Sequence, residues 1–159
     1  MNTEFYDFLM DFAKSDDCQK IVVGGIVLNG KGKILVLTRK QDDFLGGIDE
    51  LPSGNLDAGE TICHGLVREI KEETNLDVER IQSYVDFFDY QSRSGKLTRQ
   101  FNFVIISKKG GQVNLEEHDD YKWQTPEEAL LNPNITPNVK RCIRIYAFNK
   151  NQKKQPRRI

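Results

Sequence analysis

The sequence has few of the features that mark specialised classes of protein. Its 159 residues contain three cysteines, which lie far apart and form no CxxC pair. An odd number of separated cysteines argues against a disulfide framework, so we expect a reducing, cytoplasmic environment. No apolar run approaches the roughly 18 residues that a membrane-spanning helix needs. The first residues are acidic and aromatic, whereas a signal peptide is basic and then apolar, so we expect no signal peptide.

The sequence also lacks an excess of charge of either sign. The formal net charge is -1 at pH 7, so overall electrostatics give no reason to expect binding to nucleic acid or to a membrane. Residues 150–159 are the exception, with five basic residues and no acidic one. We predict this segment to be a solvated, disordered tail, and a nucleic-acid-binding arm is the alternative interpretation.

What the chain does contain is typical of one globular domain, which we place at residues 19–149. Hydrophobic residues make up 38% of the chain and charged residues 30%, and its length suits a single domain. Residues 1–18 are predicted to form an amphipathic helix that docks on this domain, because four apolar side chains recur at helical spacing. They are Phe5, Phe8, Leu9 and Phe12. The same aromatic side chains are candidates for a contact between two copies of the chain, a homodimer.

Strands and helices are predicted to alternate along the rest of the chain. Two β-rich runs flank the hairpin signal NGKG at residues 29–32, and a helix is expected from Thr61 to about Thr74. Residues 41–60 hold four glycines and a proline and are predicted to be mostly loop. Further strands are expected at 76–91, 97–109 and 120–124, and helices after the Thr-Pro pairs at 125–126 and 136–137. This order predicts an α/β (α+β) fold with helices packed on a mixed sheet.

The Thr-Pro pairs mark the starts of the two C-terminal helices. Thr125 as N-cap, Pro126 at N1 and Glu128 at N3 predict a capping box, in which two side chains satisfy main-chain N–H groups reciprocally. The last helix is predicted to bury one apolar stripe against the sheet. Its members are Val139, Cys142, Ile143 and Tyr146.

The stretch REIKEETNL, residues 68–76, places three glutamates on one side of a predicted helix. Glu69, Glu72 and Glu73 are three and four positions apart, a spacing at which like charges destabilise a helix by about 0.2–0.5 kcal/mol per pair. A solvated helix face is the ordinary interpretation of such a run. The alternative is a cation site, because clustered carboxylates are the hard oxygen ligands that Mg²⁺ or Mn²⁺ prefers.

The loop before this helix favours the cation site. In LPSGNLDAGE, Pro52, Gly54 and Gly59 permit a tight turn whose backbone can approach a ligand closely. Mg²⁺ is commonly held by one or two carboxylates together with the phosphates of a substrate. The loop and the acidic helix together therefore indicate chemistry on a polyphosphate.

Residues 54–76 resemble the Nudix box, written G-x5-E-x7-R-E-U-x-E-E-x-G-U, in which U is a bulky aliphatic residue. Eight of the nine specified positions match in register. They are Gly54, Glu60, Arg68, Glu69, Ile70, Glu72, Glu73 and Leu76. Asn75 replaces the last glycine at a helix end that needs a left-handed residue, and asparagine is the next best residue there. The resemblance extends more loosely over residues 20–148, where the chain is similar to MutT-like members.

The resemblance implies a Nudix fold, a mixed sheet sandwiched between helices, with a metal site on the acidic helix. One set of residues is implied to be both catalytic and ligating to Mg²⁺ or Mn²⁺, and one of its members would deprotonate the attacking water. The set is Glu69, Glu72 and Glu73. Arg68, also implied to be catalytic, would orient a glutamate through a salt bridge. The carbonyl of Ser53 and, through water, Glu60 would complete the metal contacts, although a charge at the helix N-terminus explains Glu60 equally well.

The resemblance also implies an acid near the C-terminus that acts as general base or as another metal ligand. The candidates are Glu116, Glu117, Asp119 and Asp120, and the sequence does not choose among them. His118 and Asp119 suggest a metal phosphohydrolase of the HD type, but two histidines are too few ligands for such a site. To the substrate we assign Gly54, Arg39, Phe44 and Phe88, although aromatic residues in strands more often belong to the core.

The implied activity is Mg²⁺-dependent hydrolysis of a nucleoside diphosphate linked to another group. Markers of some Nudix subgroups are missing past the box: Ser92 stands where ADP-ribose enzymes often have proline. Residues 92–94 likewise lack the tyrosine of diadenosine-polyphosphate enzymes. We therefore expect a nucleoside triphosphate, oxidised or not, as substrate. The alternatives are an ADP-sugar or a dinucleoside polyphosphate, the 5′ end of RNA, and a nucleotide-binding module without turnover.

Overall fold

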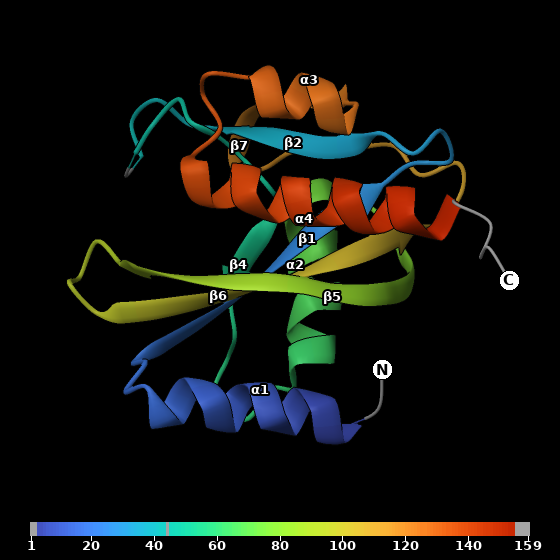
Figure 1. Ribbon diagram of the computed structural model, residues 1–159. Coiled ribbons are helices and arrows are strands. Elements are labelled where there is room, and N and C mark those ends of the chain that lie inside the picture. Colours follow the sequence, from blue (N-terminus) through green and yellow to red (C-terminus); the bar gives the residue numbers. More distant parts are fainter. Residues whose placement is uncertain (1–2, 44, 155–159) are drawn as a thin grey trace, which may run out of the picture.

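The protein is built around a mixed sheet, seen in a computed structural model that describes residues 3–43 and 45–154 (Figure 1). The strands are β1 (Lys20–Leu28), β2 (Ile34–Arg39), β3 (Asp49–Glu50), β4 (Ser53–Asn55), β5 (Val78–Gln91), β6 (Leu97–Ser107) and β7 (His118–Gln124). The main path of the sheet is β3-β2-β1-β6-β5, while β4 pairs with β1 and β7 pairs with β2. β1 and β6 are parallel and the other pairs are antiparallel, so the predicted mixed sheet is confirmed.

Helices cover both faces of this sheet. In the described residues they are α1 (Thr3–Ser15), α2 (Ile62–Thr74), α3 (Pro126–Leu131) and α4 (Pro137–Lys154). α1 and α2 share one hydrophobic cluster with the sheet, and α3 and α4 share the other. In Figure 1, α1 lies at the bottom, with α4 and α3 toward the top. The predicted sandwich is therefore confirmed. Within the described ranges, no helix is both long and apolar enough to cross a membrane.

Alternate residues of the strands fill the two hydrophobic clusters. In β1, Val23 and Val27 belong to the cluster shared with α1 and α2, whereas Ile26 and Leu28 belong to the cluster shared with α4. A strand buried on both faces reads as a continuous apolar run, which explains the stretch IVVGGIVL. The buried stripe predicted for α4 is confirmed, because all four of its residues are buried.

Local signals set the ends of several elements. The predicted hairpin turn is confirmed: Asn29 Oδ1 accepts hydrogen bonds from the main-chain N–H groups of Lys31 at 2.9 Å and Lys33 at 3.0 Å. The predicted capping box is confirmed as well. The Thr125 hydroxyl accepts from the Glu128 N–H at 3.2 Å, and the Glu128 carboxylate accepts from the Thr125 N–H at 2.7 Å.

Two segments differ from their predictions. Residues 41–60 were predicted as mostly loop but contribute β3 and β4, because their main chain pairs with β2 and β1. α4 continues through Lys154, so the first residues of the predicted basic tail are helical. Lysine and glutamine are good helix formers, and Lys150 Nζ lies 5.7 Å from the centre of the Tyr146 ring, one turn back. Residues 155–159 lie outside the described residues.

A buried cation ties α1 to the sheet. Arg99 of β6 is 2% exposed, and its guanidinium carbon lies 4.5 Å from the centre of the Phe12 ring and 4.3 Å from that of Phe87. The same guanidinium forms ion pairs with Asp89 at 2.7 Å and Asp16 at 2.8 Å. Because Phe12 lies in α1 and Asp16 directly follows it, this charge contributes to the docking of α1, together with the buried Leu9 and Ala13.

Arg99→Met is expected to lower the free energy of unfolding by about 3 kcal/mol, because two acids lose their partner and α1 loses its cation–π contact. Urea denaturation followed by circular dichroism measures the change. Lys14→Ala is the control, since its ion pair with Asp11 is exposed and should contribute less than about 0.5 kcal/mol. An Arg99→Met variant as stable as the wild type would contradict this role.

Candidate functional site

α2 begins and ends where the sequence signals predict. Thr61 is its N-cap, and the Thr61 hydroxyl accepts a hydrogen bond from the His64 main-chain N–H at 3.2 Å. Asn75 has a left-handed φ of 58°, and its main-chain N–H donates to the Lys71 carbonyl at 2.8 Å. The conformation predicted for Asn75 is therefore confirmed. With both ends capped, the three glutamates occupy the last two turns of the helix.

Two of the three glutamates are buried against β4. Glu69 and Glu73 are 9% and 7% exposed, whereas the side chain of Glu72 is 57% exposed. The Ser53 main-chain N–H donates a hydrogen bond to Glu73 Oε2 at 2.7 Å. A Cβ atom at Gly54 would lie 1.9 Å from Glu69 Oε2, so only glycine fits where this carboxylate meets the strand.

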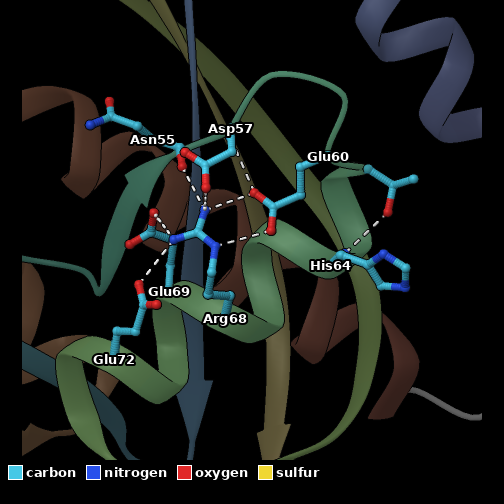
Figure 2. Close-up of polar contacts among 8 residues, drawn as sticks. Asn55, Asp57, Glu60, His64, Arg68, Glu69 and Glu72 are labelled. Atoms are coloured by element: carbon cyan, nitrogen blue, oxygen red, sulfur yellow. Dashed lines mark hydrogen bonds and ion pairs between the residues drawn. The ribbon is translucent and has the colours of Figure 1, made fainter.

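Arg68 gathers acidic groups at the solvent side of the site (Figure 2). Its Nε and Nη2 donate to the two oxygens of Glu60 at 3.0 and 2.7 Å. Its Nη1 donates to Glu69 at 2.8 Å and to Glu72 at 2.9 Å, and Nη2 also donates to the Asn55 carbonyl at 2.9 Å. The hydrogen bond between Arg68 and Glu60 is the main cause that raises the pKa of the arginine and lowers that of the glutamate. Arg68 thus holds three carboxylates in place.

The buried carboxylates are incompletely compensated. Burial raises the pKa of Glu73 from its ordinary value of 4.5 to about 9, and the Ser53 N–H opposes the shift. The nearby carboxylates of Glu50, Glu69 and Glu117 raise it further. Burial also raises the pKa of Glu69, against the effect of the neighbouring guanidinium. Ionising these buried carboxylates is therefore costly, and a bound cation would offset that cost.

The donor set fits a hard divalent cation, but its members point toward partners within the protein. Among the residues that the structure describes, no three His, Cys, Asp or Glu side chains are grouped as a ready metal site. Arg68 instead holds Glu69 and Glu72, and the Ser53 main-chain N–H holds Glu73. Mg²⁺ or Mn²⁺ would be held by the three glutamates and the Ser53 carbonyl, all oxygen donors of the kind that both ions prefer.

A second charged cluster lies beside the glutamates and was not predicted from the sequence. Glu50 of β3 accepts hydrogen bonds from Arg39 Nε at 2.9 Å and Nη2 at 2.5 Å, and its Oε1 lies 3.1 Å from His118 Nε2. Burial raises the pKa of Glu50, but the hydrogen bonds from His118 and Arg39 outweigh it, so the pKa is lowered. A single acid in a glycine-rich segment carries no sequence signal of burial, which is why Glu50 was missed.

The acidic segment 116–120 lies beside the end of α2, where Glu116 and Glu117 line one pocket with Glu72. Glu117 raises the pKa of both buried glutamates. Asp119 instead accepts a hydrogen bond from the Gln41 main-chain N–H at 3.3 Å. A pocket of about 370 Å³ opens next to the segment, lined by Lys71, Glu72, Asn75, Asn114, Glu116 and Glu117. Of the four acids predicted as candidates, Glu117 both lines this pocket with Glu72 and raises the pKa of the two buried glutamates.

Residues 19–144 match the family model described as NUDIX domain. The chain belongs to the Nudix family. It is 37% identical over 126 residues to Nudix hydrolase 2 of Arabidopsis thaliana, a match that covers 77% of this chain and 45% of that protein. It is also 37% identical over 102 residues to an ADP-ribose pyrophosphatase of Methanocaldococcus jannaschii, covering 64% of this chain and 57% of that protein. The chain thus spans about half the length of these Nudix relatives.

Solved structures agree with this Nudix assignment at the level of the fold. The crystal structure of a MutT protein from Methanosarcina mazei superposes with a TM-score of 0.69 at 23% identity, covering 85% of this chain and 96% of that one. At such identity the likeness shows the fold alone. The Nudix fold implied by the box is therefore confirmed.

The other residues assigned to the Nudix site have different surroundings. Phe88 is 9% exposed and packs in the cluster shared with α4, so its assignment to base stacking is corrected: the ring is part of the core. Arg39 is held by the carboxylate of β3. Both oxygens of Glu60 accept hydrogen bonds from Arg68. This arrangement suits a residue that positions Arg68 better than a water-mediated metal ligand or a charge at the helix N-terminus. Phe44 lies outside the described residues.

In the metal-free protein, Glu73→Gln is expected to flatten the dependence of stability on pH. The native state keeps the Glu73 proton up to about pH 9, whereas the unfolded state loses it near the ordinary value of 4.5. The unfolded state therefore binds fewer protons between these values, and the free energy of unfolding of the wild type falls as the pH rises through them. Urea unfolding in EDTA at about pH 5 and about pH 8 measures the slope.

Glu127→Gln is the matched control for this measurement, because Glu127 is an exposed acid of α3. It is expected to keep the slope of the wild type. A slope that is unchanged in Glu73→Gln would show that the buried carboxylate does not cause it.

Proposed function

We propose that this protein is a divalent-metal-dependent hydrolase that cleaves a phosphoric anhydride bond in a nucleoside diphosphate linked to another group. The observation that carries the proposal is the pair of buried glutamates, Glu69 and Glu73, packed against Ser53 and Gly54 of β4. Burying two carboxylates lowers the stability of the fold. The same pair can bind a cation that arrives together with the phosphate oxygens of a substrate. Membership of the Nudix family supports the same reaction class.

In this reaction the side chains would orient ligands and accept a proton. Mg²⁺ or Mn²⁺, when bound, neutralises phosphate oxygens and lowers the pKa of a water molecule. Arg68 keeps Glu69 and Glu72 oriented before the substrate arrives. Glu117 is exposed, lines the pocket beside Glu72 and raises the pKa of both buried glutamates, so we assign it the proton of the attacking water. The water oxygen bonds to phosphorus, the anhydride bond breaks, and a nucleoside monophosphate and the phosphorylated remainder leave.

The pocket of about 370 Å³ beside Glu72 is the proposed place for a polar part of the substrate. Lys71, Asn75 and Asn114 line it and supply N–H donors, which suit the oxygens of phosphate or ribose. Asn75 is also the one residue that departs from the Nudix box. Its side chain therefore gives this pocket a donor that the usual glycine lacks.

Two classes of substrate are to be compared first. The missing subgroup markers favour a nucleoside triphosphate, oxidised or not. The archaeal relative at 37% identity is named for ADP-ribose, which supports a nucleoside diphosphate sugar as the rival. A nucleotide-binding module without turnover is less well supported, because every glutamate of the box is present.

We also propose a cytoplasmic location, because Cys18, Cys63 and Cys142 are all free thiols. α1 remains the proposed contact between two copies of the chain. Its Phe8 is 62% exposed and stacks on Phe12, with ring centres 6.2 Å apart.

With Mg²⁺, the wild type is expected to cleave at least one member of a panel of nucleoside triphosphates, oxidised nucleoside triphosphates, ADP-ribose, dinucleoside polyphosphates and 5′-triphosphorylated RNA. Glu73→Gln and Glu117→Gln should each lower kcat by about 10²-fold or more, through loss of a metal ligand and of the proton acceptor. Product separation by ion-exchange chromatography measures the rates.

Glu127→Gln again serves as the control and should cleave the same substrate at the wild-type rate. Equal rates for the wild type and Glu73→Gln would contradict the assigned roles. Tight nucleotide binding by calorimetry, with no product from any member of the panel, would identify a binding module instead.

A further inference from the structure

His118 is a buried histidine whose orientation depends on one side chain. Its side chain is 5% exposed, and its Nε2 lies 3.1 Å from Glu50 Oε1. Arg39 binds Glu50 as a carboxylate, which only accepts hydrogen bonds, so Nε2 of the imidazole carries the hydrogen. Nδ1 has no hydrogen-bond partner within residues 3–43 and 45–154. The bond to Glu50 is therefore what sets the direction of the ring.

This bond holds the chain at the residue that follows Glu117. β7 pairs with β2 in antiparallel register, with His118 opposite Arg39, and the register shifts at this point. A bulge of this kind redirects the side chains beside it. Lys40 Nζ also donates to the Glu116 carbonyl at 2.9 Å. The C-terminal side of Glu117 is thus held on β2 by main-chain pairing and on β3 by the imidazole.

The other side of the acidic segment is held on α2. The Asn114 main-chain N–H donates to the Thr74 carbonyl, at the end of the helix, at 3.1 Å. Leu115 packs against the cluster that α2 shares with the sheet. Glu117 lies between these two anchors along the chain and lines one pocket together with Glu72, and its charge raises the pKa of both buried glutamates.

We propose that His118 and Glu50 are positioning residues that hold Glu117 at the metal site. The inference rests on the proposed function, in which Glu117 would accept the proton of a water activated by the metal, so loss of its carboxylate would also lower the affinity for the metal. The bidentate bond from Arg39 fixes the Glu50 carboxylate, and the carboxylate fixes the imidazole next to Glu117. In this arrangement Arg39 acts through Glu50, and neither Glu50 nor His118 touches the substrate or the metal.

An anchor of this kind matters because Glu117 itself is exposed. A glutamate side chain on a loop loses rotamer freedom when it is placed at a metal, and fixing the adjacent residue removes part of that cost beforehand. Partners one step removed from a metal commonly change its affinity by about 10–100-fold when they are removed. An effect of that size is readily measured.

A double-mutant cycle on Mn²⁺ affinity, followed by electron paramagnetic resonance without substrate, tests the proposal. His118→Leu and Glu117→Gln are each expected to weaken Mn²⁺ binding about 10-fold. The double variant should bind no more weakly than Glu117→Gln alone, because His118 acts through Glu117. Effects that multiply to about 100-fold in the double variant would overturn the positioning role.

Further variants separate positioning from folding. His118→Gln keeps a side-chain N–H that can reach Glu50, so it is expected to retain the wild-type affinity, and a loss equal to that of His118→Leu would count against the proposal. Should His118→Leu fail to fold, Glu50→Leu, which removes the acceptor of the His118 N–H, replaces it in the same cycle with the same expectation. His64→Leu is the matched control, since His64 is the other histidine and is exposed on α2.

Glu73→Gln distinguishes failure of this inference from failure of the proposed function. Unchanged Mn²⁺ affinity in Glu73→Gln would mean that the proposed metal site is wrong, and the positioning role with it. Loss of binding in Glu73→Gln, combined with independent effects of His118 and Glu117, would leave the metal site in place and remove only the positioning role.

Discussion

Glu69 and Glu73 are shielded from solvent because α2 packs closely against the sheet. The rest of the site is arranged around that contact. β1 permits the approach at Gly25, where a Cβ would lie 2.9 Å from Ile70 Cδ1, and β4 permits it at Gly54. The packing that completes the hydrophobic core thus also buries two carboxylates. Burying a charge costs several kcal/mol unless a partner compensates it. The cation that we propose for this site would compensate that cost.

The protein compensates the negative charge of the site at the borders of the site. Arg68 binds Glu60 on the solvent side, and Arg39 binds Glu50 on the side of β2 and β3. Each guanidinium takes up one carboxylate with two hydrogen bonds, an arrangement with high geometric specificity. Glu73 lies between these pairs with only a main-chain N–H as donor. The carboxylates at the borders are thus compensated, whereas Glu73 keeps its proton until a cation, as we propose, takes the place of that proton.

The elements farther from the glutamates keep this geometry rigid. β2 carries Arg39 and pairs with both β3 and β7, so it connects the Glu50 carboxylate with the strand that follows Glu117. Arg99 fastens α1 on the same face of the sheet as α2. α3 and α4 close the opposite face, where Phe88 fills part of the core. Aromatic side chains on the strands looked alike in the sequence. Because α3 and α4 cover the second face of the sheet, Phe88 packs in the core.

The sequence by itself determined the features that depend on neighbours a few positions away. The caps at Thr61 and Asn75, the turn at Asn29 and the capping box at Thr125 are all made within four residues, so local residue types were sufficient to predict them. The match of residues 54–76 to the Nudix box likewise indicated the family, because that resemblance rests on residue types at fixed spacing.

Only the tertiary structure decided which members of that face are buried and what surrounds them. Glu69 and Glu73 are buried and Glu72 is not, although all three look equivalent along the chain. The contact between Glu50 and His118 joins residues 68 positions apart. Burial and pairing between residues so far apart in the sequence depend on how α2 and β7 pack on the sheet. The residue types next to a given position do not specify which strand will pack beside it.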